Sequence, residues 1–125
     1  MSYDLAWHTL NRVLILTIQG DYALDDAQVV NRLVLDQLNL CQSPLSIIID
    51  ARKMSRPYNF NEIRAAQTYM DHRQLKHIYT VAGDPVVKLA MMVIFNLCRA
   101  HFHIMNEMSL AIRMIQTYEK MGYHR

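Results

Sequence analysis

The chain has 125 residues, 52% of them hydrophobic, so it is long enough for one domain with a continuous core and too short for two. Its 13 Lys and Arg and 11 Asp and Glu give a formal net charge of +2, well below the charge density that generic nucleic-acid binding requires. Cys41 and Cys98 lie far apart with no C-x-x-C pair, which argues against zinc and thiol redox motifs and predicts two buried, reduced cysteines.

The N-terminal segment predicts a hairpin of two strands. Leu5, Trp7 and Thr9 alternate with polar neighbours, and residues 12–19 contain the run VLILTI, so two strands are expected to pair through a turn at residues 10–11. The sheet is therefore expected to begin antiparallel. The segment shows no basic region followed by an apolar run, so no secretory signal is visible and a cytoplasmic location is expected.

The first helix and the central strand follow. Asp25 and Gln28 resemble a capping box at the start of a helix, and Pro44 stops the helical pattern. The apolar stripe of this helix is Ala27, Val30, Val34, Leu38 and Cys41. Residues 46–51 (SIIIDA) contain three consecutive β-branched residues, which is typical of a parallel strand buried on both faces. This segment is predicted to be the central strand of the sheet.

Another helix and strand precede a third helix. Asn59 begins a second capping-box pattern, for a helix expected to end near Arg73. Residues 77–82 (HIYTVA) predict the next strand. Asp84 at the N-cap and Pro85 at the first helical position then predict the start of the third helix.

The last elements complete an α/β pattern. Residues 102–105 predict a short edge strand, and Asn106 or Glu107 opens a last helix. The whole order predicts a single α/β domain over residues 1–125, with a mostly parallel five-stranded sheet, an antiparallel N-terminal strand and four helices. Right-handed crossovers are expected to place the helices on a common side of the sheet.

This order of elements resembles the STAS domain, the fold of bacterial anti-sigma-factor antagonists. The resemblance is carried by RVLILTIQG (residues 12–20), SIIIDARKM (46–54), HIYTVAGDP (77–85) and FHIMNEMSLAI (102–112). It covers nearly the whole chain as a pattern and implies a STAS-like superhelix. The function it implies is that of a non-enzymatic regulatory or scaffolding module that acts by protein–protein docking.

The phosphorylation motif of STAS antagonists is absent. In that family a short Asp-Ser-Ser-Gly-like motif follows the central strand, and a serine in it is phosphorylated to switch partner binding. Here residues 52–61 read RKMSRPYNFN, and Ser55 lies several positions earlier than the family serine would. No phosphosite is carried over, and Ser55 is expected to be a solvated turn residue.

The same segment is the predicted docking site for a protein partner. The candidate partner-binding residues are Arg52, Lys53, Ser55, Arg56 and Tyr58. They follow the carboxyl end of a parallel strand, where ligands of open α/β sheets usually approach, and cations there can meet an acidic surface or a phosphorylated group. Ordinary surface charges on a turn are the other explanation, with Asp50 placed to neutralise Arg52.

The third helix, expected over residues 86–98, supports an alternative function. Its few polar residues form only a narrow stripe, and it is too short to cross a bilayer, which takes about 20 residues. Its apolar flanks are expected to be covered by neighbouring helices or by a second subunit in a homodimer. The same superhelical class includes CRAL-TRIO domains, so the alternative is a small apolar or lipid-like ligand held near Met91, Met92 and Phe95.

No catalytic or metal site is predicted. His101 and His103 point to one face of a strand, but a zinc or copper site needs further ligands. Carboxylates near the strand ends, Asp21 and Asp50 among them, would have to converge before they could bind magnesium. The Gly-x-Ser-x-Gly turn of many hydrolases is absent, so neither an enzyme nor a bound cofactor is expected.

Overall fold

The computed structural model describes residues 2–57 and 59–120 of the chain, with side chains through residue 118. Its elements are β1 (Tyr3–Thr9), β2 (Val13–Gly20), α1 (Leu24–Leu40), β3 (Leu45–Met54), α2 (Phe60–Ala66), the short 3-10 helix η1 (Thr68–Asp71), β4 (Leu75–Val81), α3 (Pro85–Ile94), β5 (His101–Met105) and α4 (Met108–Lys120). The strands form one sheet in the order β1-β2-β3-β4-β5, with β1 antiparallel to β2 and every later pair parallel. The predicted fold class is confirmed.

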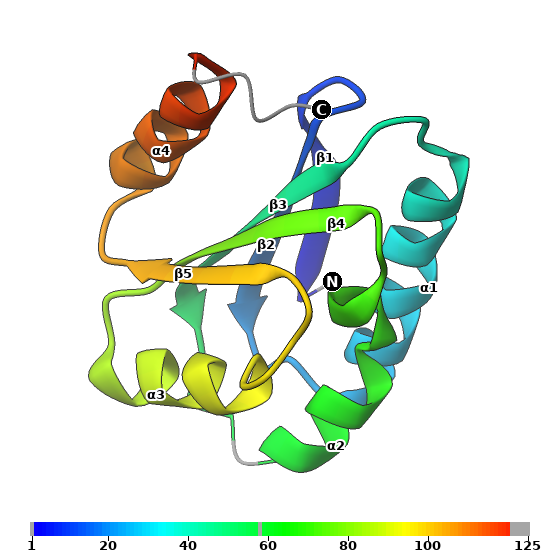
Figure 1. Cartoon of the computed structure of the whole chain (residues 1–125). Helices are drawn as coiled ribbons and strands as arrows, with labels where there is room; N and C mark the ends of the chain where they lie inside the picture. Colours follow the sequence, from blue (N-terminus) through cyan, green and yellow to red (C-terminus); the bar gives the residue numbers. More distant parts are fainter. Residues whose placement is uncertain (1, 58, 121–125) are drawn as a thin grey trace.

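The helices cover both faces of this sheet. Figure 1 shows α1, α2 and α3 on one face and α4 on the other. The larger core lies between the sheet and the first three helices, and a smaller second core lies between the sheet and α4. The expectation of a common side is therefore correct for the three crossover helices and wrong for α4. Because α4 follows the last strand, the handedness of crossovers does not constrain the face on which it packs.

The central strand β3 supplies both cores. Ile47 and Ile49 face the larger core, whereas Ile48 faces the smaller one, and all three are at most 1% exposed. This burial on both faces explains the run of β-branched residues. The strand continues beyond the predicted residues 46–51. After one extra residue in β3, opposite the step from Thr17 to Gln19 in β2, the two strands pair again as far as Met54.

Two predicted helix starts differ in outcome. For α1 the capping pair was wrong, since the N-cap residue is Ala23 and the Asp26 carboxylate accepts the Ala23 backbone N–H at 3.1 Å. For α3 the prediction is confirmed, since Asp84 accepts the Val86 backbone N–H at 2.8 Å and Pro85 occupies the first turn. In both α1 and α3, a carboxylate oxygen accepts a backbone N–H at the start of the helix. The carboxylate belongs to a first-turn residue in α1 and to the N-cap residue in α3.

Two predicted helix ends are too late in the sequence. The second helix was expected to end near Arg73, but α2 stops at Ala66 and η1 follows it. The third was expected to reach residue 98, but α3 stops at Ile94. Beyond it, Leu97 adopts a φ of 59°, a left-handed conformation that ends helical geometry and is unfavourable for a leucine.

The two cysteines are free and half-buried, where the sequence predicted full burial. The Cys41 thiol donates to the Leu38 carbonyl at 3.1 Å, and the Cys98 thiol donates to the Ala100 carbonyl at 3.2 Å. Burial raises the pKa of both thiols. Both side chains are therefore held as neutral thiols, which are poor nucleophiles.

Replacing Thr80 by valine is expected to raise the free energy of unfolding by about 1 kcal/mol. Thr80 is fully buried in β4, and its hydroxyl has no hydrogen-bond partner among the described residues. Valine keeps the shape and the β-branching and removes the cost of burying that hydroxyl. Urea denaturation of Thr80→Val checks this, with the half-buried Thr17→Val in β2 as the matched control. A loss of stability in Thr80→Val would show that the hydroxyl is satisfied in solution.

Candidate functional site

The predicted docking segment begins with an internal ion pair. Arg52 lies in the last part of β3, and its Nε and Nη2 atoms donate to the two carboxylate oxygens of Asp50 at 2.9 and 2.8 Å. This bidentate hydrogen bonding holds the pKa of Asp50 below its usual value, against the opposing effect of burial. The expected neutralisation of Arg52 by Asp50 is therefore present, and the positive charge of Arg52 is already compensated.

A second ion pair joins this segment to α3. The Nε atom of Arg56 donates to an oxygen of Asp84 at 2.9 Å. The hydrogen bond from Arg56, followed by that from the Val86 backbone N–H, lowers the pKa of Asp84. Asp84 thus caps α3 and also binds the loop that follows β3, so the loop and the helix present one surface.

The structure brings four of the five predicted partner-binding residues together. Arg52 and Lys53 lie at the carboxyl end of β3, and Ser55 and Arg56 follow in an exposed loop. The Ser55 backbone N–H donates to the Gly20 carbonyl at 2.9 Å, which ties the loop to the end of β2. Tyr58 lies outside the described residues. Because both arginines are paired, this segment is polar but less cationic than its sequence suggests.

The three predicted ligand-binding residues do not share a cavity. Met91 and Phe95 are each 3% exposed and border a void of about 10 Å³, room for about one water molecule. Met92 points the other way and is 52% exposed. A lipid-like ligand could enter here only if the larger core opened, and ligand binding at these residues stays a prediction.

The outer side of α3 is instead an exposed apolar surface. We call the following residues the α3 face: Val86, Leu89, Met92, Val93 and Leu97, which are 40%, 61%, 52%, 40% and 88% exposed. The inner side of the same helix packs on the sheet through Val87, Ala90, Met91 and Ile94. The apolar flanks that the sequence predicted are therefore not covered by neighbouring helices, and Lys88 is the one charged residue within α3.

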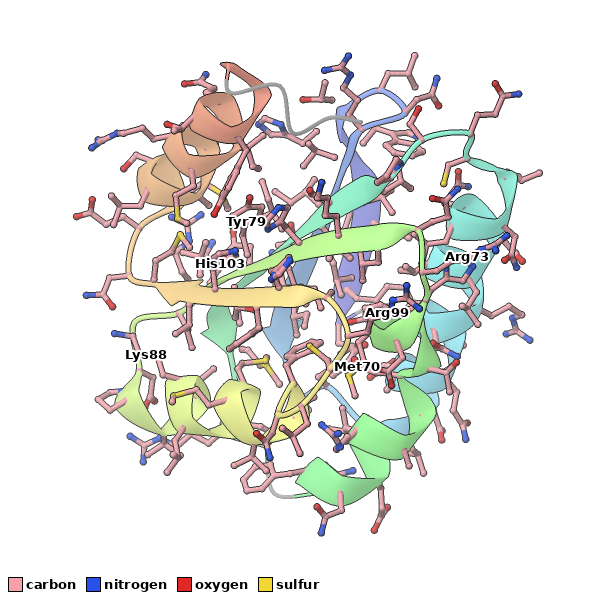
Figure 2. All side chains as sticks on the ribbon, viewed as in Figure 1. Met70, Arg73, Tyr79, Lys88, Arg99 and His103 are labelled. Atoms are coloured by element: carbon pink, nitrogen blue, oxygen red, sulfur yellow. The ribbon has the colours of Figure 1, made fainter. Side chains whose placement is uncertain are left out.

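Histidine and tyrosine side chains form a cluster on the opposite face of the sheet. Figure 2 shows Tyr79 and His103 on the side that faces α4. Their rings stack with centroids 4.9 Å apart, and His77 Nδ1 lies 3.2 Å from His103 Nε2. Tyr118 of α4 closes the cluster, 4.6 Å from the His77 ring. Burial, followed by the nearby His103, lowers the pKa of His77 to about 4, so this ring is neutral at pH 7.

The sequence predicted only part of this cluster. His101 and His103 lie two apart on β5, as expected, but His77 and Tyr118 join them through register and helix packing. The cluster could have been predicted from the alignment of β4 with β5, which pairs His77 with His101 and Tyr79 with His103. Within the described part of the chain, no group of three or more His, Cys, Asp and Glu side chains is arranged to hold a metal ion.

These elements form a STAS-like α/β fold, as the order of elements predicted. A solved structure with the same arrangement is an uncharacterised protein of the DUF3478 family with a SpoIIAA-like fold, from Shewanella loihica PV-4. The two share 12% sequence identity and a TM-score of 0.62 over 90% of each chain, a likeness of fold alone. No protein-family model and no curated protein matches the sequence. No helix in the described residues is long and apolar enough to span a membrane.

Proposed function

We propose that this domain is a non-enzymatic regulatory or scaffolding module that docks to a protein partner. The docking surface would combine the α3 face with the adjoining loop residues Arg52, Lys53, Ser55 and Arg56. The observation that carries the proposal is the exposure of five large apolar side chains along and just beyond one helix. The STAS-like fold supports it, because the resemblance implies protein docking.

The exposed side chains of the α3 face make it a candidate for the apolar part of a specific interface. Typical monomers have a largest apolar patch of roughly 300–600 Å², and such patches often mark interaction sites. Covering about 400 Å² of apolar surface would contribute roughly 10 kcal/mol before the costs of association. A partner with an apolar surface, such as an amphipathic helix, would provide that cover.

The polar residues beside α3 suit the edge of such an interface. Specific interfaces usually have an apolar centre and a polar rim that remains in contact with water. The Arg56–Asp84 and Arg52–Asp50 pairs lie at the amino-terminal end of α3 and at the end of β3. Because each pair is neutral overall, the rim would orient a partner through hydrogen bonds and would not require a strongly acidic one.

The double variant Leu89→Asp/Met92→Asp is expected to reduce partner binding at least tenfold. Both side chains point to solvent, so the substitutions place charge in the centre of the α3 face and leave the core intact. Binding is measured by quantitative capture from the source cells with cross-linking to locate the contact, and self-association by light scattering during gel filtration. Leu40→Asp is the matched control, because Leu40 is 77% exposed at the far end of α1.

Two outcomes would count against this surface. Equal capture and equal molar mass for the wild type, the double variant and the control would remove the α3 face from the proposal. Unchanged capture after triple alanine replacement of Arg52, Lys53 and Arg56 would remove the loop. A loss of dimer mass in the double variant alone would identify the partner as a second copy of the chain.

A further inference from the structure

The outer edge of β5 is a further surface on which another chain could dock. β5 (His101–Met105) is the last strand of the sheet, and among the described strands it pairs with β4 alone. Figure 1 shows it as the outermost strand, on the side of the sheet away from β1. A strand in this position presents backbone N–H and C=O groups along its free side, so it can act as a template for another strand.

Apart from its length of five residues, β5 lacks the features by which edge strands usually avoid such pairing. Its sequence, HFHIM, contains no proline, lysine, arginine or carboxylate, and its register with β4 is regular from His101 to Met105. The opposite edge, β1, contains Asp4, and its register with β2 shifts between Trp7 and Thr9. The sheet is therefore protected at β1 and open to regular pairing at β5.

The backbone of β5 directs hydrogen-bonding groups outward at two residues. The Met105 carbonyl accepts the Ala82 backbone N–H at 3.0 Å, so the backbone groups of Met105 face β4. The direction of these groups alternates along a strand. Phe102 and Ile104 therefore direct their backbone N–H and C=O groups toward the outer edge.

The side chains of β5 leave apolar surface exposed at the same edge. Phe102 and Ile104 pack against the larger core, and Met105 packs against the smaller one. All the side chains from Phe102 to Met105 are only half-buried. A strand added at this edge would cover part of the apolar surface that remains exposed on both faces of the sheet.

We propose that the outer edge of β5 pairs with β5 of a second copy of the chain, antiparallel and about a two-fold axis beside His103. In this register Phe102 lies opposite Ile104 of the second copy, and Ile104 lies opposite Phe102 of that copy. Each pair joins residues whose backbone groups face outward, so it exchanges both N–H···O bonds. Each pair also places an aromatic ring beside a β-branched side chain, which stabilises cross-strand contacts. The strand is thus complementary to itself, as the interface of a symmetric dimer must be.

This dimer goes beyond the proposed docking function and does not depend on it. The α3 face is formed by residues between 86 and 97, and none of them belongs to β5. A dimer joined through β5 would have one continuous sheet and one α3 face for each copy. Leu89→Asp/Met92→Asp is therefore expected to leave the dimer intact.

Sedimentation velocity of the whole chain over a wide concentration range tests for the dimer. The wild type is expected to shift from the mass of one chain to twice that mass as the concentration rises. Ile104→Pro is expected to remain monomeric, because proline removes the outward N–H and is tolerated at edge positions where that N–H faces solvent. Ile104→Val is the matched control, because it retains the N–H and the β-branching and should dimerise like the wild type.

Cysteine cross-linking tests the register. The symmetric pairing places His103 opposite His103 of the second copy in a non-hydrogen-bonded pair, with Cα atoms about 4.5 Å apart and within disulfide range. His103→Cys is therefore expected to form a covalent dimer on mild oxidation. His101→Cys is the matched control, because position 101 lies opposite Met105 and about 13 Å along the strand from position 101 of the second copy. This control should stay uncross-linked, as should the wild type with Cys41 and Cys98.

Three results would overturn the proposal. They are a monomeric wild type at every concentration, a dimer that Ile104→Pro does not weaken, and equal cross-linking of His103→Cys and His101→Cys. A dimer that is lost in Leu89→Asp/Met92→Asp and kept in Ile104→Pro would instead assign self-association to the α3 face. If Ile104→Pro is not folded, the comparison of the two cysteine variants decides.

Discussion

The variant Ile49→Ala is expected to lower the free energy of unfolding by about 3–5 kcal/mol. Ile49 lies in the central strand and is 1% exposed within the larger core, where three crossover helices pack on the sheet. Those helices are each joined to two strands, so they cannot move in to fill the space that the lost atoms leave. The residual cavity adds to the lost transfer free energy, and urea denaturation measures the sum.

The neighbouring variant Ile48→Ala separates the two cores. Ile48 faces the smaller core with Ala111 and Ile115. Removing its side chain is expected to lower the free energy of unfolding by about 2–4 kcal/mol and to loosen α4 more than the other helices. Amide hydrogen exchange should accelerate more in α4 than in α1. The exposed variant Leu40→Ala is the control and should change stability by less than about 0.5 kcal/mol. Equal acceleration in both helices would show that the two cores unfold as one unit.

Stability is expected to decrease by about 2 kcal/mol as the pH falls from 6.5 to 4. Burial lowers the pKa of His77 from its usual value near 6.5 to about 4, so over this interval the unfolded chain binds more protons than the folded one. The free energy of unfolding therefore falls with pH in this window. Among the described residues, the ionisable groups around the ring are His101 and His103 on β5, Lys76 and Tyr79 on β4, and Tyr118 on α4.

The variant His77→Gln tests this assignment. Glutamine does not titrate, so the slope of unfolding free energy against pH should fall by more than half between pH 6.5 and 4. Burial also lowers the pKa of His103, and hydrogen bonds lower the pKa of Asp50 and of Asp84, so these groups account for the slope that persists. His8→Gln is the control, because His8 is exposed in β1, and it should keep the wild-type slope. An unchanged slope in His77→Gln would assign the acid sensitivity to other groups.

The sequence predicted the order of elements because the strongest local patterns agree with the tertiary structure. Three consecutive isoleucines indicate a strand buried on both faces, and Asp84 followed by Pro85 indicates a helix start. The end of α2 had no such signal, because no glycine or proline separates Ala66 from η1. Helix boundaries that depend on tertiary contacts are not visible in local sequence.

The position of α4 follows from a requirement that the sequence analysis did not use. Ile48 and Tyr79 are buried on the face opposite the crossover helices, so an additional element must cover that face. Only a segment outside the crossovers can do so, and α4 is the helix that follows the last strand. The buried apolar residues on both faces of the central strands therefore indicate that each face is covered. The topology is also needed to infer that α4 is the helix that covers the second face.

The candidate sites depended on contacts between distant residues. Arg56 and Asp84 are 28 positions apart, and His77 and His103 are 26 apart, so no local pattern indicated either pair. The exposure of Leu89 also depended on whether another helix covered α3. The sequence analysis placed charged and aromatic residues at the strand ends where the structure has them. Which of these residues interact could be seen only in the three-dimensional structure.

The order of the strands also bears on how the molecule assembles. Each strand after the first pairs with the strand that precedes it in the chain, so the sheet can grow in one direction without waiting for a distant segment. Such a chain can add one strand at a time as it leaves the ribosome, with each crossover helix packing before the next strand arrives. Until α4 is synthesised, the growing sheet would expose Ile48 and Tyr79 to solvent. Nascent chains that end before α4 would therefore present an apolar sheet surface that favours aggregation during synthesis.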